Sequence, residues 1–174
     1  MTVLVTYATK HGSTREIAEA VATTLVDRGI PTEALAIDTV ADVGQYEAVV
    51  LGSAVYMDRW LREATEFARR HREQLTARTL WLFSSGPLGT EVVDAEEQPK
   101  ELAELRQTLG PRDHRLFDGA LTRDALGFRE RMIMKAVKAP EGDFRDWDDI
   151  RAWAITIAAE LALDARAQER GGGS

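Results

Sequence analysis

The sequence predicts an α/β fold in which a five-stranded parallel sheet of order 2-1-3-4-5 carries helices on both faces, as a three-layer sandwich. Short apolar segments alternate with amphipathic helical segments along nearly the whole chain, and such alternation is typical of parallel sheets. The segment 48–51, Ala-Val-Val-Leu, is apolar throughout, as expected of a strand that is covered on both faces. Sheets of this kind bind ligands beyond the carboxyl ends of their strands, where the strand order reverses.

Each element follows from its own local pattern. Residues 14–28 form a helix because Ile17, Val21 and Leu25 share one face, and Gly29 followed by Pro31 ends it. Further helices are expected at 60–75, at 97–109 and from about residue 146 onward. Strands are expected at 3–7, 32–37, 48–51, 79–83 and 116–121. These elements make a single domain over 1–164, and 165–174 is a tail whose end, 171–174, is a flexible linker or cloning remnant.

Composition and charge exclude several classes of protein. The 174 residues carry a net charge of −7, which argues against nucleic-acid binding because that function needs a basic surface. The chain has no cysteine, so thiolate metal sites and thiol catalysis are excluded, and no metal site is expected. No apolar run approaches the roughly 20 residues of a membrane span. No signal peptide is recognised either, so we expect a cytoplasmic protein.

The first strand runs directly into a loop of small and hydroxyl-bearing residues that suits a phosphate. The loop comprises Thr9, Lys10, His11, Gly12, Ser13 and Thr14. A helix follows at once, so backbone N–H groups and the helix dipole favour an anion at this point. The Walker pattern and the dinucleotide pattern Gly-X-Gly-X-X-Gly are both absent. The alternative is an ordinary turn in which Ser13 or Thr14 caps the helix.

Two further loops, after the third and fourth strands, would complete a site for a flat ring. The first would give polar contacts from Ser53 and the backbone of Ala54 and Val55, and an apolar face from Tyr56 and Met57. Trp60, although close by, is expected in the core. The second loop contains two glycines and a proline, so its chain can approach a ligand closely. Its residues are Ser84, Ser85, Gly86, Pro87, Leu88 and Gly89.

Several stretches of the chain match a known family. They are Thr-Lys-His-Gly-Ser-Thr-Arg-Glu-Ile-Ala at 9–18, Leu-Gly-Ser-Ala at 51–54, Glu-Phe-Ala-Arg-Arg-His at 66–71, Phe-Asp-Gly-Ala-Leu at 117–121, Arg-Met-Ile-Met-Lys at 131–135 and Asp-Trp at 146–147. With them, residues 2–163 resemble the flavodoxin superfamily. Within that superfamily the chain is similar to the bacterial menaquinone-dependent protoporphyrinogen IX dehydrogenase group.

The resemblance implies a flavodoxin-like fold, FMN bound at the three loops, and oxidation of protoporphyrinogen IX with electrons passed to a quinone. The flavin would carry the redox chemistry, so no catalytic residue is named. The loop 84–89 and the segment 139–145 depart from the group, and both lie where a substrate would be selected.

Three other functions stay open. The chief alternative is a flavodoxin-type electron carrier, which has a redox partner protein and no small substrate of its own. A binding module whose flavin site has degenerated is a second alternative. A signalling receiver domain would need clustered acidic residues after the first strand, where Tyr7, Ala8 and Thr9 stand instead.

Residues 123–138 form a basic segment in an otherwise acidic chain, with large apolar residues between the charges. One interpretation is a helix that rests on an anionic membrane surface and meets quinone there, so that the protein is peripheral at the inner membrane face. The alternative is an amphipathic helix that packs on the sheet and keeps its charges in solvent.

Overall fold

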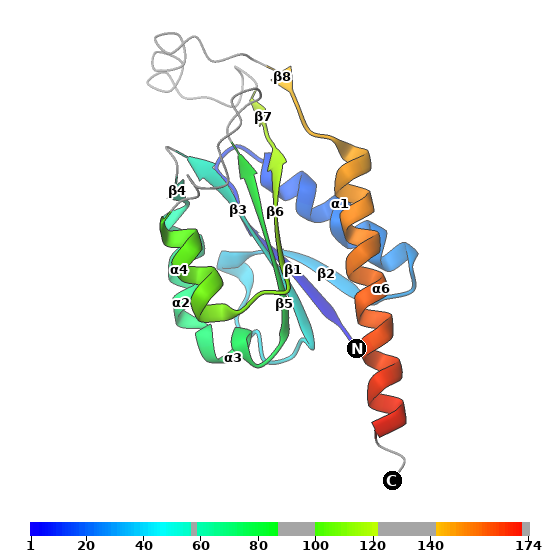
Figure 1. Cartoon of the computed structure of the whole chain (residues 1–174). Coiled ribbons are helices and arrows are strands. Elements are labelled where there is room, and N and C mark those ends of the chain that lie inside the picture. The colour runs from blue at the N-terminus through cyan, green and yellow to red at the C-terminus, as the bar shows by residue number, and fades with distance from the viewer. Residues whose placement is uncertain (57–58, 87–99, 122–141, 172–174) are drawn as a thin grey trace, which may run out of the picture.

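The computed structural model describes residues 1–56, 59–86, 100–121 and 142–171. Its centre is a parallel sheet ordered β2-β1-β3-β5-β6 (Figure 1). This confirms the predicted order, because β4 is a two-residue strand that pairs only with β3. The strands of the sheet are β1 (Val3–Ala8), β2 (Thr32–Ala36), β3 (Ala48–Tyr56), β4 (Arg59–Trp60), β5 (Thr79–Gly86) and β6 (Asp113–Asp118).

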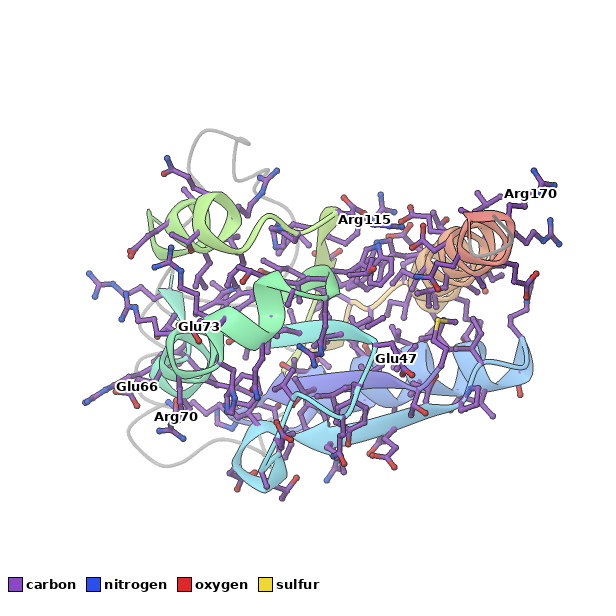
Figure 2. All side chains as sticks on the ribbon, turned by 90° about the horizontal axis from the view of Figure 1, so that it is seen from below. Glu47, Glu66, Arg70, Glu73, Arg115 and Arg170 are labelled. Atoms are coloured by element: carbon purple, nitrogen blue, oxygen red, sulfur yellow. The ribbon has the colours of Figure 1, made fainter. Side chains whose placement is uncertain are left out.

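Helices cover both faces of the sheet and give the predicted three layers. On one face lie α1 (Ser13–Asp27) and α6 (Trp147–Gly171), and on the other lie α2 (Arg62–Arg70), α3 (Arg72–Thr76) and α4 (Lys100–Leu109). The view from below in Figure 2 shows the two layers on opposite sides of the sheet. Glu66 and Arg70 point outward from the surface of α2 in that view.

The core is double because alternate residues of each strand face opposite layers. In β1, Val3 and Val5 pack with α1 and α6, whereas Leu4 packs on the side of α2, α3 and α4. The core on the side of α1 and α6 also contains Phe83, whose ring centroid lies 6.1 Å from that of Trp153. Burial on both faces explains why the central strands are apolar at successive positions.

The prediction of one helix at 60–75 is wrong in two respects. Its first residue belongs to β4, in which Arg59 and Trp60 pair antiparallel with the end of β3. The helix is then interrupted at His71, whose φ of −100° and ψ of 19° separate α2 from α3. The first turn of α2 is reached through an extended Leu61.

The last predicted strand and the tail also need correction. Instead of one strand at 116–121, β6 begins at Asp113 and a separate strand, β7 (Ala120–Leu121), pairs antiparallel with β8 (Gly142–Asp143). A short 3-10 helix, Ile37–Thr39, follows β2. Residues 165–171, expected in the tail, continue α6. Its start is close to the predicted one, because Asp146 Oδ1 accepts from the N–H groups of Asp148 and Asp149 at 3.0 Å.

Candidate functional site

The carboxyl ends of β1, β3 and β5 meet at one edge of the sheet. In the parallel register Ala8 lies beside Ser53, and Ala54 lies beside Ser85. The loops that follow these strands therefore start from adjacent positions, as predicted from the sequence. Parallel strands bring this about because their carboxyl ends all lie on one side of the sheet.

The loop after β1 is shaped by its glycine. Gly12 has φ +90° and ψ −15°, a left-handed backbone conformation that residues other than glycine rarely adopt. The N–H of Gly12 donates to Thr9 Oγ1 at 2.9 Å and closes the loop on itself. The carbonyl of Gly12 accepts from the N–H of Glu16 at 3.2 Å and starts α1.

Gly12 is the N-cap of α1, and no side chain caps this helix. The alternative in which Ser13 or Thr14 caps the helix is therefore wrong. The N–H groups of the first turn of a helix have no partner within the helix, so this terminus suits an anion.

The Thr14 hydroxyl is the most informative atom of this loop. Its side chain is 0% exposed, and Thr14 Oγ1 has no hydrogen-bond partner among the described residues. A buried polar group left unpaired costs about 1–3 kcal/mol. The Thr6 hydroxyl shares this state, but it lies inside β1, two residues before the strand ends. A phosphate oxygen at the N-terminus of α1 would accept a hydrogen bond from Thr14 and remove this cost.

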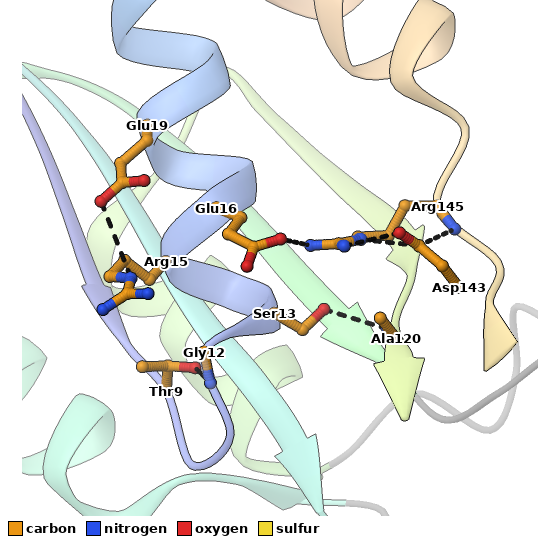
Figure 3. Close-up of polar contacts among 9 residues, drawn as sticks. All are labelled: Thr9, Gly12, Ser13, Arg15, Glu16, Glu19, Ala120, Asp143 and Arg145. Carbon is orange, nitrogen blue, oxygen red and sulfur yellow. Dashed lines mark hydrogen bonds and ion pairs between the residues drawn. The ribbon is translucent and has the colours of Figure 1, made fainter. Parts of the chain in front are cut away.

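Ser13, Lys10 and His11 have different surroundings. Ser13 Oγ accepts from the N–H of Ala120 at 3.0 Å, which ties the loop to β7 and leaves the Ser13 hydroxyl proton for another acceptor (Figure 3). Lys10 Nζ lies 3.7 Å from the ring centroid of Tyr56, which is 37% exposed at the end of β3. Loop and strand are thus joined by a cation–π contact. His11 is partly buried in the loop.

The end of β3 is more constrained than the sequence indicated. Ser53 is fully buried; its hydroxyl donates to the Ala54 carbonyl at 2.9 Å and accepts from the N–H of Leu61 at 3.1 Å. These hydrogen bonds hold the backbone at the end of β3, and the Ser53 side chain has no surface exposed to solvent. Val55 and Tyr56 pair with β4. Met57, also predicted as a site residue, lies outside the described residues.

The predicted strand at 79–83 continues through Gly86, so the described part of the expected loop 84–89 is the buried end of β5. Ser84 Oγ accepts from Trp60 Nε1 at 2.8 Å and lies 2.9 Å from His114 Nε2. Ser85 is buried as well, and Gly86 pairs with Asp118 of β6. Trp60 is a core residue, as expected. Pro87, Leu88 and Gly89 lie outside the described residues.

His114 is a residue that the sequence reading missed. Its pKa is lowered from 6.5 to about 4, chiefly by burial and also by the nearby Arg106, while Asp113 opposes the shift. The imidazole is therefore neutral at physiological pH. In the tautomer that carries the ring proton on Nδ1, His114 Nε2 accepts from the Ser84 hydroxyl, whose oxygen accepts in turn from Trp60. The sequence offers only a lone histidine in a polar strand as a signal.

Metal binding and membrane crossing find no support in the part of the chain that is described. No cluster of three or more histidine, aspartate or glutamate side chains there could hold a metal ion. None of the helices in the described ranges has the length and apolar character to span a membrane.

Comparison with known proteins then identifies the family. The sequence model of the flavodoxin domain family matches residues 4–148. The chain belongs to the flavodoxin domain family. Members of this family bind FMN, so the cofactor expected from the sequence is confirmed at the level of the family. No curated protein sequence matches this flavodoxin-domain chain.

Solved structures give the same fold at low sequence identity. A flavodoxin from the domain Archaea is 17% identical with a TM-score of 0.62, and the match covers 93% of this chain and 99% of that one. Flavodoxin 2 from Bacillus cereus is 17% identical with a TM-score of 0.60, covering 92% and 99%. The rubredoxin oxygen:oxidoreductase from Desulfovibrio gigas is 16% identical with a TM-score of 0.63, covering 93% of this chain and 36% of that chain. These likenesses confirm the fold and leave the protoporphyrinogen IX dehydrogenase group a prediction.

Proposed function

We propose that this flavodoxin-domain chain binds FMN at the carboxyl edge of its sheet and serves in electron transfer. The observation that carries the proposal is the buried, unpartnered Thr14 hydroxyl at the N-terminus of α1, beside the left-handed Gly12. An anion with several acceptor oxygens satisfies both that hydroxyl and the first-turn N–H groups. When bound, FMN supplies electron transfer in one-electron or two-electron steps.

The residues of this chain would bind and orient the cofactor. The Ser13 and Thr14 hydroxyls would donate hydrogen bonds to the phosphate monoester. The exposed ring of Tyr56 would offer a flat aromatic face, which Lys10 covers in this structure. Ser53 and Ser84, both buried, would hold the surrounding backbone in place through the hydrogen bonds described above.

A titration with FMN and with riboflavin, which lacks the phosphate, tests this function. We expect FMN to bind with a calorimetric signal and quenching of its fluorescence, and riboflavin to bind much more weakly. Saturating FMN without heat or quenching would overturn the proposal. Equal affinities for the two compounds would remove the phosphate site.

We further propose the oxidation of protoporphyrinogen IX with a quinone as acceptor, on the resemblance of the stretches at 9–18 and 131–135. The test is turnover of protoporphyrinogen IX by the FMN-loaded protein with a menaquinone analogue, followed by porphyrin fluorescence. If the FMN-loaded protein oxidises protoporphyrinogen IX no faster than free FMN does, this activity is contradicted. FMN binding would not be affected by that result.

A second candidate is an electron carrier that works with a redox partner protein. It is supported by the flavodoxin domain family, whose model matches residues 4–148, and by the fold that the chain shares with solved flavodoxins. A carrier should cycle with a flavodoxin reductase, take up electrons in two resolved one-electron steps, and leave protoporphyrinogen IX unchanged.

We propose separately that residues 123–138 contact a membrane surface. These residues lie outside the ranges that the structure describes. The proposal rests on the basic and apolar composition of the segment. Reversal of charge at Arg129, Arg131 and Lys135 should reduce co-sedimentation with anionic vesicles. Unchanged co-sedimentation would remove the proposal, and a cytoplasmic location would still be a prediction.

A further inference from the structure

Arg145 is the most enclosed charged residue of the phosphate-loop region. Its side chain is 7% exposed, although both of its carboxylate partners are about half exposed. One guanidinium nitrogen lies 2.5 Å from Glu16 Oε2, and two others lie 2.6 and 2.7 Å from the Asp143 carboxylate (Figure 3). The guanidinium also lies 4.5 Å from the ring centroid of Trp147. The planar group is thus held on its edges and on one face.

Glu16 stands in the first turn of α1, the turn that begins at the phosphate loop. A lone carboxylate so close to the helix N-terminus would compete with a bound phosphate for the same positive potential and would repel it. A phosphate monoester adds roughly −1.5 to −2 charges near neutral pH. Arg145, which follows β8, brings its guanidinium to Glu16 and offsets its charge.

The same contacts hold the β7–β8 ribbon against the loop. The N–H of Ala120 in β7 donates to Ser13 Oγ, and the N–H of Phe144 donates to the Gly119 carbonyl at 3.3 Å. Arg145 follows β8 and joins it to α1 across 129 residues of sequence. The hydrogen bonds from Arg145 lower the pKa of the Asp143 carboxyl, so Asp143 stays ionised and keeps its ion pair with Arg145.

We propose that Arg145 is a positioning residue of the phosphate site, which offsets the charge of Glu16 so that the N-terminus of α1 accepts a dianionic monoester. This inference rests on the proposed function and assigns to it a residue that acts through Glu16. Charge compensation is the essential part, and anchoring of the ribbon accompanies it.

The test compares FMN and riboflavin affinities of four proteins: wild type, Arg145→Gln, Glu16→Gln and the double variant. Arg145→Gln should weaken FMN binding by about fivefold, the size expected of one charge near a helix N-terminus, and leave riboflavin binding unchanged. Adding Glu16→Gln should restore FMN affinity, because the repelling carboxylate is gone. The loss in Arg145→Gln should shrink as salt is raised.

Arg112→Gln is the matched control. Arg112 also pairs with two carboxylates, Glu160 at 3.6 Å and Asp164 at 2.7 Å, and lies 5.7 Å from the ring centroid of Trp81. It stands just before β6, at the opposite edge of the sheet from the phosphate loop. Its replacement should leave the affinity for FMN unchanged.

The outcomes separate this inference from the function on which it rests. If wild type binds no FMN, both fail. If wild type binds FMN and Arg145→Gln binds it equally well, or loses FMN and riboflavin affinity alike, only this inference fails. If Arg145→Gln does not fold, Glu16→Gln alone decides: affinity at or above that of wild type supports charge compensation, and a weaker affinity overturns it.

Discussion

The Ser84 hydroxyl lies 2.9 Å from His114 Nε2, in a buried chain of hydrogen bonds that begins at the indole N–H of Trp60. Three elements meet in this chain, since Trp60 is in β4, Ser84 in β5 and His114 in β6. The network therefore fixes β4, which pairs with the end of β3, against β5 and β6. With a neutral imidazole His114 Nε2 can accept from Ser84, whereas protonation of His114 would reverse that hydrogen bond and place a charge in a largely buried position.

Acid should weaken the fold through His114. Its folded-state pKa of about 4 lies below the unfolded value of 6.5, so between these values the unfolded chain binds the additional proton. The free energy of unfolding should then fall as pH drops from about 6.5 to 4, by at most about 3 kcal/mol, and this term should level off below pH 4. Urea unfolding at a series of pH values measures it.

The control for this prediction removes the titrating group itself. His114→Gln should flatten the stability profile between pH 6.5 and 4. Parallel profiles for wild type and His114→Gln would show that other groups cause the acid effect.

The layers and the site edge could be predicted from the sequence because they follow from local patterns. Ile17, Val21 and Leu25 define one buried face of α1, and parallel strands align their carboxyl ends without further information. The start of β6 could not be found in this way. It is an edge strand that opens with the polar run Asp113-His114-Arg115 and leaves Leu116 55% exposed, so its alternation of apolar and polar residues is weak.

Features that depend on distant contacts were missed for a different reason. The break at His71 does not disturb the apolar spacing, since Ala64, Ala68 and Leu75 are all buried as one continuous helix would require. Likewise, nothing local to Arg145 indicates a partner at Glu16, because that ion pair exists only once β8 has docked on α1. The phosphate loop was recognisable from its residue types, whereas its electrostatic support was not.

Replacing Thr14 with valine should separate stability from binding. Valine has nearly the same shape but no hydroxyl, so the variant loses a buried unpartnered polar atom. We expect the free energy of unfolding of the cofactor-free protein to rise by about 1 kcal/mol, and the affinity for FMN to fall about tenfold. Thermal unfolding and calorimetry measure the two effects.

Thr24→Val in the same helix is the comparison. The Thr24 hydroxyl donates to the Ala20 carbonyl at 2.8 Å, away from the loop, so FMN affinity should not change in this variant. A Thr14→Val protein that binds FMN as wild type does would show that its hydroxyl has no part in the phosphate site.

Gly12→Ala should strain the phosphate loop. The backbone there has φ +90°, and a residue with a Cβ pays about 1–2 kcal/mol for a left-handed conformation. Space is not the limit, since an added Cβ would meet only Arg15 at 4.0 Å. Gly12→Asn should cost less than Gly12→Ala because asparagine tolerates this region better. Chemical unfolding ranks the variants, and equal losses for both would argue against backbone strain.

Gly52→Ala should disrupt the core beneath the site by a direct clash. A Cβ on Gly52 would lie 2.0 Å from the tip of the Phe83 ring, which is fully buried and packed against Phe117 and Trp153. Since the ring has no free space in which to move, we expect a loss of about 3 kcal/mol. Phe83→Leu removes the ring atoms that clash, so adding it to Gly52→Ala should cost less than the sum of the two single changes. Strictly additive losses in urea unfolding would mean that the ring can move aside.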